Sequence, residues 1–295
     1  MATHNNIPDL QIFGKGRGDF RLPSGYVDKD GRVFNHIYLK EMTGVEDDIM
    51  DDDDLNVSER MSRVIASCTE KLTTATDTNK EGETLPTSID DQKIILSAVS
   101  DNLGEGGLPF TISDRMACLL FIRRLSMGDQ YDLDRHTCPV CGKKIKGKHI
   151  DLNTLEIIYC KDPTKRRVRV TLPRSKRVAI LRVLTASNER KISEIRPDGK
   201  DVKSSAILAR LESLDDKKLN NDAREDLAVV KSLPKLDRLH LLHVFNAMEG
   251  SIETEVELNC SAAACGVAFK FDLDLGQVFF SNPDMEVSLD ALDWV

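Results

Sequence analysis

The sequence contains no apolar run that approaches the ~20 residues needed to cross a bilayer. Its first residues, Met-Ala-Thr-His-Asn-Asn, lack the basic and then apolar layout of a secretory signal peptide. These two absences lead us to expect a soluble, intracellular product with no membrane span. With 41 basic and 49 acidic residues, the chain is mildly acidic, which argues against indiscriminate binding of nucleic acid by the whole molecule.

Familiar catalytic and nucleotide-binding motifs are also missing. There is no Gly-x-x-x-x-Gly-Lys-Ser/Thr loop, dinucleotide glycine fingerprint, His-Glu-x-x-His or Gly-x-Ser-x-Gly. The glycines of residues 14–18 follow no predicted strand and indicate a flexible arm. The four aspartates at 51–54 lack the glycine and distal glutamate of a calcium loop. The sequence therefore predicts a protein that is not an enzyme and has no small-molecule substrate, although a hydrolase site without a local motif stays open.

The seven cysteines are an odd number, and four of them form two close pairs, Cys138 with Cys141 and Cys260 with Cys265. Such pairs favour thiolate ligation of a metal in a reducing compartment over a framework of disulfides. The other three cysteines are expected to be small core residues, because free cysteine is often buried: Cys68, Cys118 and Cys160.

One sequence pattern occurs twice. Residues 114–142 hold Asp-Arg-Met, an apolar helical stretch, an acidic strand and Cys-Pro-Val-Cys-Gly, and residues 237–266 hold Asp-Arg-Leu, a similar stretch and strand, and Cys-Ser-Ala-Ala-Ala-Cys-Gly. From the Asp to the first Cys is 24 residues in the first copy and 23 in the second. Leu-Pro pairs at 22–23 and 172–173 extend the duplication. The pattern predicts an α+β fold of two tandem related repeats, each with a strand, helices, a strand, a cysteine knuckle and a final strand.

This duplication divides the chain into three parts. Residues 1–19 are expected to be an extended N-terminal arm, residues 20–160 the first repeat and residues 161–295 the second. Sequence patterns predict helices at 57–72, 114–125, 206–214, 222–233 and 236–248, and strands at 33–39, 130–137, 253–258 and 268–275, while residues 178–185 repeat the pattern of residues 37–43. Thr43 and Glu46 are spaced like a capping box that starts a helix, whereas the acidic run that follows is expected to be a solvated loop.

Two cysteine turns, each contributing two thiols, can together supply the four ligands of a tetrahedral zinc ion. Gly142 and Gly266 directly follow the second cysteine of each pair, where a tight turn needs a permissive backbone. We therefore expect one structural Zn²⁺ bound by Cys138, Cys141, Cys260 and Cys265 in a shared zinc-ribbon-like module. Two alternatives stay open: ordinary thiols without a metal, and a local site that joins the first pair to His136, His149 or Cys160.

Charge is unevenly distributed along the chain. Residues 46–54 carry seven carboxylates in nine positions, whereas residues 143–190 hold fourteen Lys and Arg against four acids. The basic segment at 161–190 supports a runner-up function, a nucleic-acid-binding zinc-ribbon protein with Lys and Arg on phosphates. Because no aromatic residue lies between Tyr159 and Phe245 to stack on bases, the sequence does not favour nucleic acid as a partner.

Several short motifs, in their order along residues 20–283, resemble baseplate-hub and tail-assembly proteins of contractile-tailed bacteriophages. They are Leu-Pro-Ser-Gly at 22–25, Tyr-Leu-Lys-Glu-Met-Thr-Gly at 38–44 with its acidic tail, Ile-Arg-Arg-Leu-Ser-Met-Gly-Asp at 122–129, the first cysteine pair and Phe-Phe at 279–280. The resemblance implies a non-enzymatic part of the tail baseplate, or a factor that assembles it. It implies other tail proteins as partners and a place in the virion tail, after assembly in the host cytoplasm. The wider second cysteine spacing, without a proline, departs from this pattern.

Overall fold

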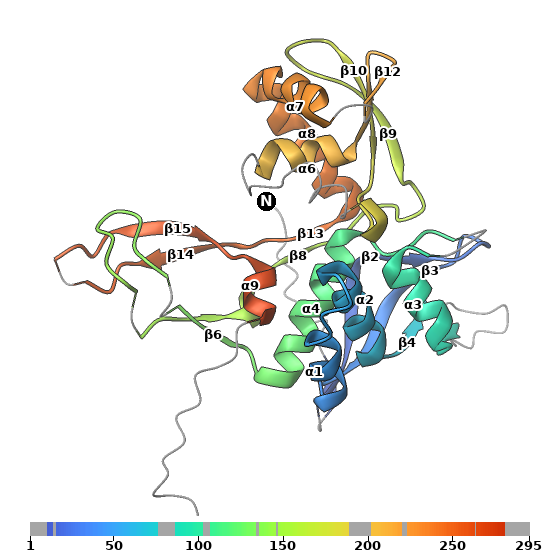
Figure 1. Cartoon of the computed structure of the whole chain (residues 1–295), viewed down its shortest axis with the longest axis vertical. Helices are drawn as coiled ribbons and strands as arrows, with labels where there is room; N and C mark the ends of the chain where they lie inside the picture. Colours follow the sequence, from blue (N-terminus) through green and yellow to red (C-terminus); the bar gives the residue numbers. More distant parts are fainter. Residues whose placement is uncertain are drawn as a thin grey trace, which may run out of the picture.

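The structure, a computed structural model, describes residues 11–13, 16–75, 86–102, 107–133, 136–145, 147–188, 202–219, 223–262 and 264–280. Over these residues the chain is a mixed α+β protein with eight α-helices and several antiparallel sheets, which confirms the predicted α+β class. Figure 1 shows a larger sheet with helices packed beside it, a second sheet with its own helices towards the other end, and hairpins that project sideways.

The first sheet has the strand order β1-β2-β3-β4-β5, and each neighbouring pair is antiparallel. Its strands are β1 (Gln11–Phe13), β2 (Arg17–Val27), β3 (Val33–Lys40), β4 (Thr69–Thr73) and β5 (Ser88–Ile89). The β2–β3 hairpin turns where the sequence places Asp30-Gly31, and the Asp28 carboxylate accepts from the backbone N–H groups of Asp30 and Arg32 at 2.9 Å. Part of the predicted N-terminal arm is thus strand, and residues 1–10 and 14–15 lie outside the described residues.

Four helices belong to this sheet: α1 (Gly44–Met50), α2 (Val57–Cys68), α3 (Gln92–Ser100) and α4 (Ile112–Met127). Three of them begin with a capping box, at Thr43, Asn56 and Thr111. Each box pairs two backbone N–H groups that would otherwise lack a partner at a helix start. The capping box that the sequence predicts at Thr43 and Glu46 is therefore present.

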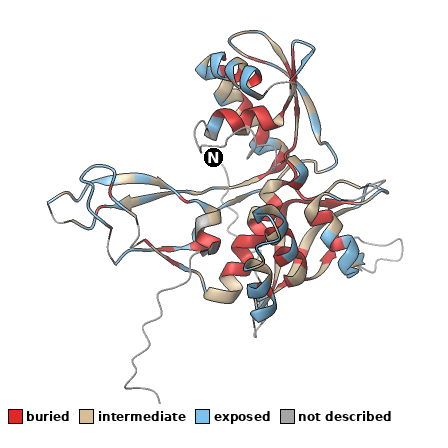
Figure 2. Cartoon of the chain, in the orientation of Figure 1, coloured by how far each residue is buried: buried red, intermediate tan, exposed pale blue. Residues whose placement is uncertain are grey.

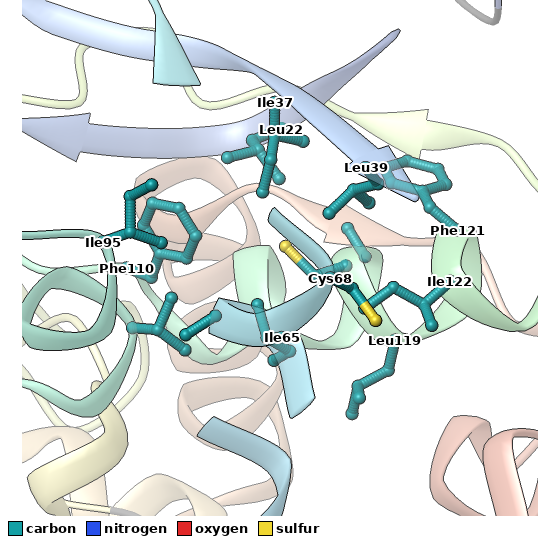
Figure 3. Packing of buried hydrophobic residues seen from close by; sticks show 14 of the residues in the cluster. Leu22, Ile37, Leu39, Ile65, Cys68, Ile95, Phe110, Leu119, Phe121 and Ile122 are labelled. Carbon is teal, nitrogen blue, oxygen red and sulfur yellow. The ribbon is translucent and has the colours of Figure 1, made fainter. Parts of the chain in front are cut away.

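Burial of apolar side chains between this sheet and its helices forms the first core. Phe20 stacks on Phe121 with ring centroids 4.2 Å apart, and Figure 3 shows Cys68 close to Ile65 in the same cluster. Cys68 and Cys118 are both fully buried, as predicted. Burial raises the pKa of the Cys68 thiol to about 12, so it stays protonated at neutral pH.

The second sheet has the order β12-β11-β10-β9, also antiparallel throughout. Its strands are β9 (Arg167–Thr171), β10 (Val178–Arg182), β11 (Leu211–Leu214) and β12 (Lys217–Lys218), and its helices are α6 (Val202–Arg210), α7 (Ala223–Ser232) and α8 (Lys235–Glu249). A separate core forms here, in which Leu181, Ile207 and Leu241 are fully buried.

The projecting part consists of short hairpins. Its elements are β6 (Gln130–Asp132), β7 (His149–Asp151), the 3-10 turn η1 (Leu152–Thr154), β14 (Glu255–Asn259), β15 (Ala268–Asp272) and α9 (Leu275–Phe280). At its base β8 (Ile157–Ile158) pairs with β13 (Ser251–Ile252). Figure 2 shows that this part is mostly exposed away from α9. A third apolar cluster, which includes Leu133, Ile145 and Val278, holds it together.

The fully buried Arg123 of α4 ties this projecting part to the first core. Its Nε donates to the Val278 carbonyl at 2.9 Å, and its two other nitrogens donate to the carbonyls of Gly128 at 3.2 Å and Gln130 at 3.3 Å. One buried guanidinium therefore satisfies three backbone carbonyls from the end of α4, β6 and α9.

Both Leu-Pro segments are anchored by the aspartate in the first turn of a later helix. Residues 22–25 form an irregular bend within β2, and residues 172–175 form the turn between β9 and β10; both are called Leu-Pro turns below. Asp114 accepts from the N–H groups of Ser24 at 2.7 Å and Gly25 at 2.9 Å, and Asp237 accepts from those of Arg174 at 2.6 Å and Ser175 at 3.0 Å. Both carboxylates are fully buried. Charge-assisted bonds of this kind are stronger than neutral ones, so each aspartate fixes a hairpin to a helix.

The arginine after each aspartate also makes equivalent contacts. Arg115 bonds to Ser62 of α2 at 3.2 Å, and Arg238 bonds to Ser204 of α6 at 2.9 Å. Both of these serines lie seven residues before the strand into which their helix runs directly. The helices α4 and α8 then end at Gly128 (φ 83°, ψ 177°) and Gly250 (φ 69°, ψ 178°), in nearly the same backbone conformation.

Several predicted boundaries were wrong. The helices expected at 57–72 and 206–214 end earlier, because α2 and α6 continue as β4 and β11. The strand expected at 130–137 ends at Asp132. The loop expected for the acidic run is shorter than predicted, because the helix that begins after Thr43 extends to Met50 and only residues 51–54 of the run lie outside it; the buried Glu46 accepts from Thr43 and Ser67 and thereby closes the capping box.

Candidate metal centre

The first cysteine knuckle is a tight turn within the projecting part. The Cys138 N–H donates to the Lys143 carbonyl and the Gly142 N–H donates to the Cys138 carbonyl, both at 2.9 Å. Gly142 has φ +69°, a conformation that costs a glycine little and other residues more. The turn leaves Cys138 buried and Cys141 exposed at the surface.

The second knuckle connects β14 to β15 and has a longer loop. The Cys260 N–H donates to the Val267 carbonyl at 3.0 Å, and Ala262 accepts from Cys265 at 2.8 Å and Gly266 at 3.1 Å. Gly266 again has a positive φ of 55°. Despite the wider spacing, the sulfur atoms of Cys260 and Cys265 lie within 4.8 Å of each other.

All four predicted cysteines meet. Their sulfur atoms lie within 4.8 Å of one another, and the Cys141 and Cys260 sulfurs, from residues 119 positions apart, are separated by 3.7 Å. Four thiolates about 2.3 Å from a central zinc ion lie about 3.8 Å from each other in a tetrahedron. A disulfide would require a separation of about 2.05 Å. The cluster therefore has the spacing of a metal site and can hold one metal ion.

The residues of the local alternative lie elsewhere. His136 packs its ring against Phe271 with centroids 4.7 Å apart, His149 pairs with Asp132, and the Cys160 thiol donates to the Met248 carbonyl at 2.9 Å. Among the described residues, the group of cysteine, histidine and carboxylate side chains close enough to share an ion is the four-cysteine group. The geometry therefore favours the shared arrangement over the local one.

The thiols differ in acidity. Hydrogen bonds from the N–H groups of Cys141 and Val140 lower the pKa of Cys138 to about 7. At Cys260 the Ala262 N–H lowers the pKa, but burial and the three neighbouring thiols outweigh it and raise the pKa to about 11. One thiolate thus forms readily at neutral pH, whereas further negative charge in the same space needs a cation to balance it.

The basic segment is less free than its sequence suggests. Arg167 forms a two-fold contact with Glu212, at 2.9 and 2.7 Å, and Arg177 bonds to Asp215 at 2.5 Å. Arg169 lies 3.6 Å from Asp216. Acidic residues of β11 and the turn after it therefore neutralise part of the positive charge that a nucleic acid would use.

The two sheets meet at a joint that the sequence analysis did not identify. Ser24 Oγ donates to the Glu249 carbonyl at 3.0 Å, Ser113 Oγ to the Gly250 carbonyl at 2.9 Å, and the Ile112 N–H to the Leu184 carbonyl at 2.9 Å. The buried carboxylate of Glu249 also accepts from two nitrogens of Arg210 at 2.8 Å each. The recurring Leu-Pro and Asp-Arg pairs were the sequence feature from which this joint could have been predicted, because they mark the turns and helix starts that form it.

No helix in the described part of the chain is both long enough and apolar enough to cross a membrane. In comparisons with models of protein families, with curated proteins and with solved structures, the chain matches none of them significantly.

Proposed function

We propose that this protein is a non-enzymatic structural or assembly component whose two halves are held in a fixed relation by one structural zinc ion. The observation that carries the proposal is the convergence of four cysteine sulfurs from two knuckles, with 119 positions between Cys141 and Cys260. An ion bound there joins the segment after α4 to the segment after α8. Structural zinc contributes roughly 10 to 16 kcal/mol in small peptides at pH 7, so such a link is strong enough to fix the module.

The set of ligands favours zinc and a structural role. Four thiolates in a tetrahedral arrangement suit zinc or an iron–sulfur centre, and zinc sites with four protein ligands leave no position for water or substrate. The two turns with a glycine after the second cysteine match a zinc ribbon, in which each hairpin provides half of the ligands. A closed site of this kind does not supply Lewis-acid catalysis.

We further propose that the chain is a tandem repeat in which β2 to α4 correspond to β9 to α8. The matching Asp anchors at the Leu-Pro turns support this correspondence, as do the two serines bound by Arg115 and Arg238. The common backbone conformation at the ends of α4 and α8 is a further agreement. The knuckles follow at equivalent places, so the zinc joins two copies of one unit.

The resemblance to baseplate-hub and tail-assembly proteins provides the biological setting of this proposal. The partners are then other tail proteins of a contractile phage, and the protein acts in the virion tail baseplate after assembly in the host cytoplasm. Three arginines of the basic segment form ion pairs with carboxylates of the same chain, so less positive charge is left for a nucleic acid. This favours the assembly role over the nucleic-acid alternative.

A genetic test separates these possibilities. In a contractile-tailed phage that encodes this chain, a nonsense mutation in its gene is expected to give complete heads but no finished tails by electron microscopy. The wild-type protein and a Cys160→Ser variant restore tails when supplied from a plasmid, whereas a variant with Cys260→Ser and Cys265→Ser does not. Normal contractile particles from the nonsense mutant would overturn the proposed function.

A further inference from the structure

The joint between the two halves is formed by two different surfaces. We call the Leu-Pro turn together with the first turn of its Asp-Arg helix the turn face: residues 22–25 with 111–116 in the first half, and 172–175 with 234–239 in the second. We call the last residues of the Asp-Arg helix together with the capping threonine segment the cap face: residues 42–45 with 126–128 in the first half, and 184–187 with 248–250 in the second.

Inside the molecule, the turn face of the first half packs on the cap face of the second. The hydrogen bonds from Ser24, Ser113 and Ile112 to the second half all cross this contact. A backbone bridge between Thr111 and Thr185 extends it. Because the two faces differ, this contact is of the head-to-tail type, which leaves one face of each kind uncovered.

The two remaining faces are exposed at equivalent positions. Leu236 and Leu239, on the turn face of the second half, are 56% and 52% exposed, whereas Ser113 and Met116 at the matching positions are not exposed. On the cap face of the first half Val45 is 61% exposed.

The matched threonines differ in the same way: Thr43 is exposed, whereas Thr185 is buried. Leu236 and Leu239 are therefore uncovered where the matching positions of the internal joint are protected, whereas Ser187, which matches Val45, is itself exposed.

The side chains on the two open faces are complementary. The open turn face presents the two leucines with the exposed cations Arg174 and Lys235. The open cap face presents Val45, and the exposed carboxylates Asp47 and Asp48 lie next to it in α1. Figure 1 shows α1 at one end of the long axis and the second sheet with α7 at the other. A contact between the two faces thus joins different molecules rather than closing within one.

We infer that a second copy of this chain docks on the open turn face through its own open cap face, repeating the internal joint between molecules. The inference rests on the tandem repeat proposed above. Leu236 stands where Ser113 makes its hydrogen bond in the internal joint, so the external contact depends on apolar burial and opposite charge rather than on that bond. Head-to-tail contacts of this kind produce closed rings or open filaments.

Two single-face variants test the inference. Leu236→Asp places a carboxylate in the centre of the turn face, and Val45→Asp does the same on the cap face. Both positions lie in the first turn of a helix, where an acidic residue is favourable, so folding is expected to be retained. Val57→Asp is the matched control, because Val57 is equally exposed and begins α2 outside both faces.

The assay is sedimentation velocity on the zinc-loaded full chain over a wide range of concentration. Wild type and the Val57 variant are expected to form species larger than a dimer, and each single-face variant alone to associate roughly a hundredfold more weakly, since a buried unpaired carboxylate is costly. A mixture of the two single-face variants retains one intact face of each kind and is expected to form a heterodimer and nothing larger.

Three results would overturn the inference: a wild-type monomer at the highest concentration, undiminished association of either single-face variant, or a mixture that stays monomeric. The last result would indicate a symmetric contact, in which each molecule contributes the same surface, because two variants that both damage that surface cannot complement each other. Zinc content, measured on the same samples, is expected to stay at one ion per chain. If association fails while the zinc content remains at one ion per chain, the inferred contact between molecules is wrong but the proposed metal site is not contradicted.

Discussion

Replacing Asp114 by Ala tests the idea that a single buried carboxylate fixes the first Leu-Pro turn. Besides the N–H groups of Ser24 and Gly25, Asp114 accepts from the N–H and the hydroxyl of Thr111 at 2.9 Å each. The substitution therefore leaves three buried backbone donors without a partner. Burial raises the pKa of Asp114, although the nearby Arg166 and these hydrogen bonds lower it.

Each unsatisfied buried donor costs ~1–3 kcal/mol, so the three together set an upper limit of roughly 9 kcal/mol. Entry of water reduces this sum, whereas the half-buried Arg166 loses its opposite charge, and we expect a net loss of about 3–5 kcal/mol, as for other broken buried charge contacts. Asp237→Ala leaves two backbone donors, those of Arg174 and Ser175, without this partner and is expected to cost about 2 kcal/mol. The exposed Asp48 has the same side chain, and Asp48→Ala is expected to change stability by less than about 0.5 kcal/mol.

The assay is urea unfolding of the three variants and the wild type, with hydrogen exchange of the segment 22–25 as a local reading. The exchange measurement is needed because a chain with two cores can unfold in more than one step. We expect faster exchange in that segment for Asp114→Ala and no change for Asp237→Ala. If Asp114→Ala resembles Asp48→Ala in both measurements, the anchoring role of Asp114 is wrong.

Two further predictions concern the thiols and the low-pH behaviour. A zinc chelator is expected to make the four knuckle cysteines reactive towards a thiol reagent. Cys68 and Cys118 are expected to stay unreactive until the protein unfolds, because burial raises the pKa of both thiols. Reaction of six thiols before unfolding would contradict this prediction. The pKa of Asp237 is lowered, because hydrogen bonds from Ser175 and Arg174 outweigh its burial. The ionised Asp237 therefore stabilises the fold above about pH 4, and this stabilisation is lost as the pH falls through its folded pKa. The difference in unfolding free energy between the wild type and Asp237→Asn is expected to narrow below about pH 4. A constant difference from about pH 6 to about pH 3 would contradict this prediction.

Parts of the fold could be predicted from the sequence because they obey a clear period. The helices expected at 222–233 and 236–248 lie at Ala223–Ser232 and Lys235–Glu249, within a few residues of their predicted ends. The four cysteines that meet were also identified, since two paired knuckles with following glycines leave few other arrangements. Local sequence patterns were sufficient in these cases.

Other elements depend on contacts that a local pattern does not show. The strands β4 and β11 follow α2 and α6 without a turn residue, so nothing in the sequence separates helix from strand there. The capping box at Thr43 and Glu46 predicts where α1 begins, but its extension into the acidic run is not predicted and depends on the burial of Glu46. The joint between the halves was missed for the same reason: Glu249 and Arg210 become partners only when the chain has folded.

One zinc ion bound by both knuckles together is the feature on which the proposed function depends. Elemental analysis of the purified chain, alongside a Cys260→Ser, Cys265→Ser variant and a Cys160→Ser control, measures it. We expect one zinc ion per chain in the wild type and the control, and none in the double variant. A full equivalent of zinc retained by the double variant, or two ions in the wild type, would contradict the shared site.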